Sequence, residues 1–68
     1  MIKKLKELFE RETHLKLRHT GESAESYYEC SGASYKNIKN KVKSFNANHN
    51  CSVYAYNDYI KDVTVIVF

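Results

Sequence analysis

Apolar side chains recur every three or four residues at the start of the chain. This spacing predicts an amphipathic helix over residues 2–12, because such positions share one face of a helix. On the solvated side, lysine, glutamate and arginine lie four residues apart, where they favour ion pairs. The residues of the apolar stripe are Ile2, Leu5, Leu8 and Phe9.

Two alternating segments follow and predict a hairpin. In residues 13–19, leucines alternate with histidines and cations, as in a half-exposed strand. Residues 25–31 alternate in the same way and predict the returning strand. Between them, residues 20–23 read TGES, whose glycine and polar side chains favour a turn. The two faces of the returning strand carry Tyr28 with Cys30, and Tyr27 with Glu29.

A second helix is predicted after Gly32. Ser34 is a suitable N-cap, because its hydroxyl can accept a hydrogen bond from the first turn. The helix should end within residues 46–50 (NANHN), since asparagine tolerates left-handed and turn conformations. The apolar stripe of this helix consists of Tyr35, Ile38, Val42 and Phe45.

Residues 51–57 and Val63–Phe68 predict a final hairpin, with its turn opening at Asn57–Asp58. The last segment is apolar on both alternating faces, which is typical of a central strand. The order is therefore α-β-β-α-β-β in one domain, residues 1–68. It predicts an α+β fold: a four-stranded antiparallel sheet with two helices on one face and the C-terminal strand central. This is a permuted form of the ferredoxin-like order.

The length of the last hairpin loop decides which face each side chain occupies, because strand side chains have period two. An odd loop places Val63, Val65 and Val67 under the helices. An even loop exchanges the two faces of the final strand, so that Thr64, Ile66 and Phe68 lie under the helices instead. We expect the odd loop, because it keeps Asp62 out of the helix-covered core. The opposite face then carries Tyr54, Tyr56, Thr64, Ile66 and Phe68, with Tyr27 beside them.

The composition limits the function classes. The chain has 68 residues, 43% of them hydrophobic, which fits one small folded domain and excludes wholesale disorder. No apolar run approaches the ~18 residues of a membrane span. The N-terminus is charged and periodic, unlike a signal peptide. These features predict a cytoplasmic protein without membrane contact, with Cys30 and Cys51 as reduced thiols.

Charge is segregated along the chain. Between Cys30 and Asn57 there is no aspartate or glutamate, but there are four lysines. Lys36, Lys39 and Lys43 share one face of the predicted second helix. A solvated face is the simplest interpretation. The functional interpretation is a surface for phosphates or for an acidic partner, and lysine without arginine suits loose electrostatic contact.

The residues that could form a metal or catalytic site lack the spacing that such sites require. Nitrogen and sulfur donors are present, but CxxC and HxxxH spacings are missing. No glycine-rich phosphate loop occurs, and no spacing joins a nucleophile to a base. We therefore expect no metal, no cofactor and no enzymatic activity. The donors considered are His14, His19, His49, Cys30 and Cys51.

Tyrosines on a sheet face without a helix suit two kinds of partner. Tyr27, Tyr54 and Tyr56 can stack on unpaired bases, or act as anchors in a protein interface. The lysines lie on a helix, on the far side of the sheet from these rings. That separation favours a protein partner over a nucleic acid.

The small size, the compactness, the absence of motifs and the tyrosine-bearing sheet resemble the small inhibitors carried by phages and mobile elements, including anti-CRISPR proteins. The resemblance extends over the whole chain, and no motif, in SYYECS or CSVYAY for example, identifies a particular family. The resemblance implies a non-enzymatic protein that occupies a surface of a larger host complex, often one that handles nucleic acid. The alternative is a small protein that binds RNA or single-stranded DNA, and a homodimer is compatible with both. The candidate contact residues are Tyr27, Tyr54, Tyr56, Ile66, Phe68, Lys36, Lys39 and Lys43.

Overall fold

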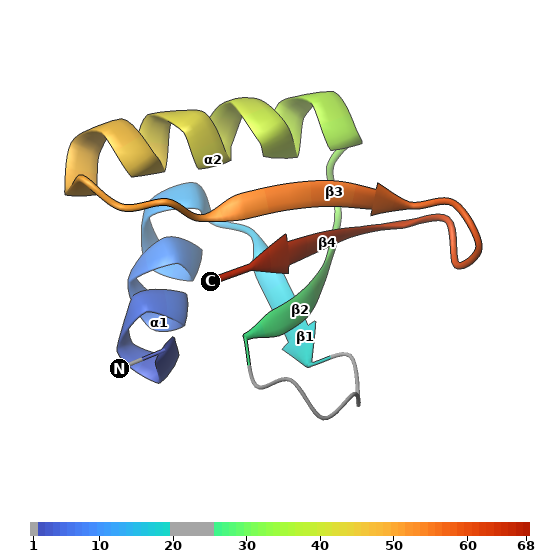
Figure 1. Ribbon diagram of the computed structural model, residues 1–68, viewed down its shortest axis with the longest axis horizontal. Helices are drawn as coiled ribbons and strands as arrows, with labels where there is room; N and C mark the ends of the chain where they lie inside the picture. The colour runs from blue at the N-terminus through green and yellow to red at the C-terminus, as the bar shows by residue number, and fades with distance from the viewer. Residues whose placement is uncertain (1, 20–25) are drawn as a thin grey trace.

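The computed structural model describes residues 2–19 and 26–68, and the predicted turn at 20–23 lies outside them. The elements follow in the predicted order α-β-β-α-β-β (Figure 1). They are α1 (Ile2–Thr13), β1 (Lys16–His19), β2 (Tyr27–Ser31), α2 (Tyr35–His49), β3 (Tyr54–Asp58) and β4 (Val63–Val67).

The four strands form one antiparallel sheet in the order β1-β2-β4-β3. The C-terminal strand β4 therefore lies between β2 and β3, and its central position is confirmed. Both helices pack on the same face of the sheet, since buried residues from both contribute to one core. The buried members of this core are Phe9, Leu15, Leu17, Cys30, Ile38, Val42, Phe45, Val53, Ala55 and Ile66.

Local hydrogen bonds end α1 and begin the sheet. The hydroxyl of Thr13 donates to the carbonyl of Phe9 at 2.6 Å and accepts the Leu15 N–H at 3.3 Å. His14, which lies between Thr13 and Leu15, has a left-handed backbone conformation, with φ of 61°. The strand predicted over residues 13–19 is therefore shorter, because its first residues turn the chain out of the helix.

Both ends of α2 are capped as predicted. The Ser34 hydroxyl accepts the Asn37 N–H at 3.2 Å, and Asn50 takes a left-handed conformation at the C-terminus. Ile38, Val42 and Phe45 are buried along one stripe, so the spacing of three and four identified the face that contacts the sheet.

The side chain of Asn46 joins α2 to the start of β3. Its amide nitrogen donates to the Val53 carbonyl at 2.8 Å, and its oxygen accepts the Val53 N–H at 2.8 Å. The same oxygen accepts a 3.4 Å hydrogen bond from the Cys51 thiol. Val53 is buried, so its N–H and carbonyl need hydrogen-bond partners inside the protein, and the Asn46 side chain supplies both.

The prediction of an odd final loop is wrong. Residues 59–62 form the turn, and its even length pairs Ala55 with Ile66 and Tyr56 with Val65. Val63, Val65 and Val67 therefore face away from the helices, and Thr64 and Ile66 face the core.

Asp58 explains the length of this turn. Its carboxylate accepts the N–H groups of Ile60 at 3.0 Å and Lys61 at 3.2 Å, which folds the chain back directly after β3. Asp62 lies in the turn with φ of 54°, a conformation that aspartate tolerates. It is exposed there, so keeping its charge out of the core did not require an odd loop.

Replacing Asn46 with alanine should lower the free energy of unfolding by about 1–3 kcal/mol, because the Val53 N–H and carbonyl would lose their buried partner. Urea unfolding followed by circular dichroism measures this change. Asn48→Ala is the matched control, since Asn48 is exposed on the same helix. Equal stability of the two variants would contradict the assigned role of Asn46.

The two cysteines should differ in reactivity. Burial, and secondarily the charge of Glu10, raises the pKa of the Cys30 thiol from 9.0 to about 11, whereas Cys51 is only half-buried. At pH 8, native Cys51→Ser protein should react with a disulfide reagent only as fast as it unfolds. Native Cys30→Ser protein should react directly. Rapid labelling of Cys30 would contradict its burial.

The raised pKa of Cys30 makes the free energy of unfolding depend on pH. Between about pH 9 and 11 the unfolded state loses the Cys30 proton and the folded state keeps it. The unfolded state then binds fewer protons, so this thiol makes the free energy of unfolding fall as pH rises through that window. Cys30→Ala should remove that part of the decline, measured by urea unfolding at pH 8, 9 and 10.

Candidate binding surface

We use the name open face for the side of the sheet turned away from both helices. The pairing register determines its membership, because cross-strand partners share a face. The open face carries Lys16 and Arg18 from β1, Tyr27, Glu29 and Ser31 from β2, Tyr54, Tyr56 and Asp58 from β3, and Val63, Val65 and Val67 from β4.

Tyrosines border an aliphatic strip on the open face. Val67 pairs with Tyr27 on one side and with Tyr54 on the other. Tyr54 is 62% exposed, and the centroid of its ring lies 6.1 Å from that of the Tyr56 ring. Val65 is 3% exposed although it lies on the side away from the helices. The three tyrosines predicted as contacts thus lie together on the open face.

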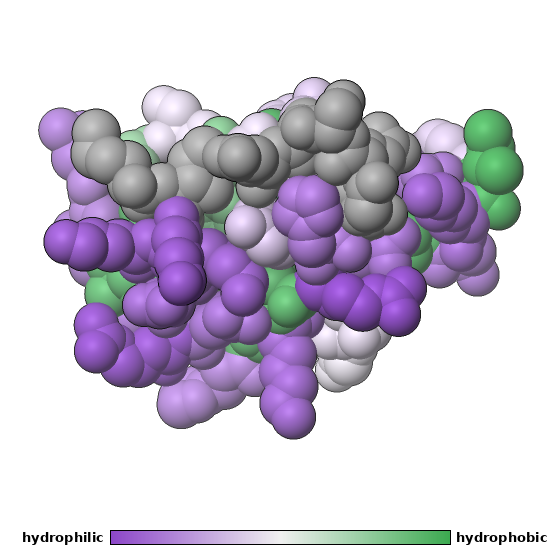
Figure 2. Space-filling model, turned by 90° about the horizontal axis from the view of Figure 1, so that it is seen from below, coloured by the Kyte–Doolittle hydropathy of each residue, from purple (hydrophilic) through white to green (hydrophobic). Residues whose placement is uncertain are grey.

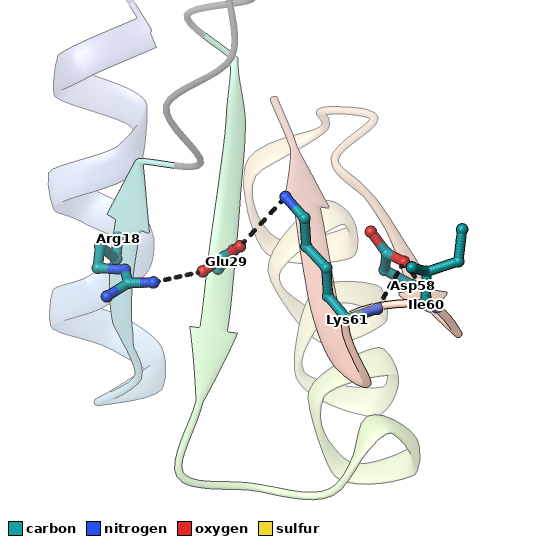
Figure 3. A network of polar contacts seen from close by, with 5 residues as sticks. All are labelled: Arg18, Glu29, Asp58, Ile60 and Lys61. Atoms are coloured by element: carbon teal, nitrogen blue, oxygen red, sulfur yellow. Dashed lines mark hydrogen bonds and ion pairs between the residues drawn. The ribbon is translucent and has the colours of Figure 1, made fainter.

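The Glu29 carboxylate pairs with two cations at the open face. The Glu29 carboxylate accepts a hydrogen bond from the Arg18 guanidinium at 3.0 Å, and the Lys61 ammonium lies 3.9 Å from its other oxygen (Figure 3). The Glu29 side chain is only 15% exposed, whereas those of its two partners are more exposed. The carboxylate therefore lies within the face and draws two cations to it.

The turn between β3 and β4 presents two exposed apolar side chains. Tyr59 is 88% exposed and Ile60 is 97% exposed. The turn projects at one end of the molecule in Figure 1, and Figure 2 shows hydrophobic atoms protruding at that same end. Neither residue was predicted as a contact from the sequence. The sequence feature that could have identified them is two large apolar residues in a row between the polar residues Asp58 and Lys61.

The lysines predicted as contacts lie on a different surface. Lys36, Lys39 and Lys43 are exposed on α2, which packs on the opposite side of the sheet from the open face. The Lys39 ammonium lies 5.7 Å from the centroid of the Tyr35 ring. As the sequence indicated, the lysines and the three sheet tyrosines do not meet.

Ile66 and Phe68 are not part of the open face, which corrects their assignment as contacts there. Ile66 is completely buried beneath the helices. The ring of Phe68 lies edge-on to Phe9 at 5.5 Å and to Tyr28 at 5.7 Å, and it packs against the core. The even turn length brings both residues to the helix-covered side, where they stabilise the fold.

The metal-donor candidates are dispersed. Across residues 2–19 and 26–68, no three His, Cys, Asp or Glu side chains come together as a metal site. His49 pairs with Glu12 across the two helices, and its ring lies 4.6 Å from Phe45. His19 packs edge-on to Tyr28 at 5.5 Å. These contacts give the two histidines roles in packing.

No model of a known protein family matches the chain, and no significant match was found to a curated protein or to a solved structure. In the part of the chain that the structure describes, no helix has the length and apolar character needed to cross a membrane.

The two sides of the sheet should respond differently to truncation. Ile66→Ala should lower the free energy of unfolding by about 2–5 kcal/mol, because it leaves a cavity in the core. Tyr54→Ala should change it by only about 0.5 kcal/mol, since most of that ring is in solvent. Urea unfolding of both variants checks the difference. A larger loss for Tyr54→Ala would contradict the register.

Proposed function

We propose that this chain is a non-enzymatic protein-binding module that contacts its partner through the open face and the adjoining Tyr59–Ile60 turn. The observation that supports it most is the combination of tyrosines with an aliphatic strip and a carboxylate, Glu29, that is paired with two cations. Large aromatic side chains with apolar neighbours are the usual anchors of protein interfaces, and unpaired charge is usually sparse at their centres.

The electrostatics of the open face favour a protein over a nucleic acid there. The Glu29 carboxylate lies within the face, and Asp58 lies at the end of β3 beside the turn. The two cations nearest to Glu29, Arg18 and Lys61, are engaged with its carboxylate and are therefore less available to phosphates that approach the tyrosines. A protein that stacks bases on tyrosines while lysines hold the phosphates needs both groups on one side. Here α2 and the open face lie on opposite sides of the sheet, so that alternative lacks support.

The exposed turn adds a rigid contact to the proposed surface. Asp58 binds the N–H groups of Ile60 and Lys61, so the turn is held before any partner arrives. A side chain presented on a fixed backbone loses little conformational entropy on binding, which favours affinity. We include Ile60 as an apolar anchor that enters a pocket on the partner protein.

An inhibitory role is the further part of this proposal. It comes from the resemblance in size and tyrosine content to small phage and mobile-element inhibitors. Such a role requires the open face to occupy a surface that the host complex needs for its own activity. Identifying the partner by affinity purification, and then measuring that partner's activity with and without the chain, tests this part.

Binding to the purified partner should depend on both parts of the surface. Tyr54→Ala and Ile60→Asp should each raise Kd by about 10-fold or more, the effect of removing an interface anchor. Isothermal titration gives Kd, and circular dichroism confirms that the variants fold. Tyr35→Ala is the matched control, because it removes the same side chain from α2 on the other side of the sheet.

Unchanged binding by both Tyr54→Ala and Ile60→Asp would contradict the proposed surface. A loss of binding by Tyr35→Ala in a folded protein would instead place the contact on α2. Sedimentation of the chain alone distinguishes a third outcome, in which two copies pack their open faces together and no other protein is required.

A further inference from the structure

The outer side of α2 carries an uncompensated positive charge. Its four lysines are exposed, and within residues 2–19 and 26–68 none of them forms an ion pair with an acid. The cations that do form such pairs belong to other elements. We use the name lysine face for the exposed side of α2 that holds Lys36, Lys39 and Lys43. Lys41 lies on the other flank of the helix, about 140° around the axis from Lys36.

The neighbours of these lysines are also suited to phosphates. Apart from the Tyr35 ring beside Lys39, those exposed on α2 are small or neutral and hydrogen-bonding, and the acid Glu12 of α1 lines a pocket with Asn40, Ser44 and Asn48. Lysine together with asparagine and serine is a common set for contacts to the nucleic-acid backbone. The exposed neighbours are Asn37, Asn40, Ser44, Ala47 and Asn48.

The spacing of the lysines fits a run of phosphates. Lys36, Lys39 and Lys43 recur at three and four residues, so they follow one face of the helix. Seven residues of helix rise about 10 Å, at about 1.5 Å per residue. Along a duplex axis, one strand carries a phosphate about every 3.4 Å, so this length matches about three phosphates.

We propose that the lysine face binds the phosphate backbone of duplex nucleic acid without reading its sequence. The only ring beside these lysines is that of Tyr35 among the described side chains, and Lys39 lies over it. The lysine face therefore offers charge without a stacking platform, which favours a duplex over unpaired bases. Because it lies opposite the open face, the chain can hold a protein and a nucleic acid at once.

The probe is a fluorescently labelled 16-base-pair DNA duplex, titrated with the full chain and followed by anisotropy. Neutralising about three phosphates should make Kd rise about 40-fold between 50 and 200 mM salt. The triple variant Lys36→Glu, Lys39→Glu, Lys43→Glu should lose binding. The charge-matched control Lys3→Glu, Lys4→Glu, Lys16→Glu alters exposed lysines elsewhere and should retain most of the affinity.

Tyr54→Ala should bind the duplex normally, which separates this inference from the proposed function. Three results would overturn it. The first is absence of salt-dependent duplex binding, and the second is equal weakening by the two triple variants, which would indicate net charge alone. The third is that polyglutamate, or the single strand of the same DNA, binds the chain at least as strongly as the duplex does. The lysine face would then suit an acidic protein or unpaired bases.

Lys36 offers a second readout. It lies in the first turn of α2, which holds no acid, although the helix dipole favours negative charge there. Lys36→Glu should therefore raise Tm by about 2–5 °C while weakening duplex binding at least several-fold. A higher Tm with unchanged Kd would contradict a role for Lys36 in binding.

Discussion

The four-residue turn between β3 and β4 determines which surfaces this protein presents. The Asp58 carboxylate binds two N–H groups of the turn, and the resulting even length places Ala55 opposite Ile66. Because side chains alternate along a strand, a change of one residue would exchange the two sides of β4. The valines of that strand would enter the core, and Ile66 would enter solvent. The composition of the open face therefore depends on this turn.

The helix-covered side of the sheet is stabilised by a series of aromatic contacts. Phe9 of α1 lies edge-on to Phe45 of α2 at 5.0 Å and to the C-terminal Phe68 at 5.5 Å. Phe9 is fully buried and thus joins both helices to the end of the chain. With the core completed on this side, the tyrosines of the open face and the lysines of α2 remain on opposite outer surfaces. This separation suits two different partners.

The sequence predicted what depends on local pattern. The stripe of α2, its Ser34 cap and its Asn50 terminus followed from spacing and residue type, and so did the order of elements. The placement of Ile66 and Phe68 could not be predicted in this way, because Val63–Phe68 is apolar on both alternating faces and either side fits a core. Only the turn chemistry of Asp58 resolves the choice. The exposure of Ile60 was missed for a related reason, since no period marks a residue in a turn.

The most direct test is a measurement of how β3 pairs with β4, because this pairing defines both the core and the open face. Nuclear Overhauser contacts between backbone protons of the two strands report that pairing in solution. The structure predicts contacts that place Ala55 opposite Ile66 and Tyr56 opposite Val65. Contacts that place Ala55 opposite Val65 or Val67 would contradict it, because the valines would then lie beneath the helices and the open face would have a different composition.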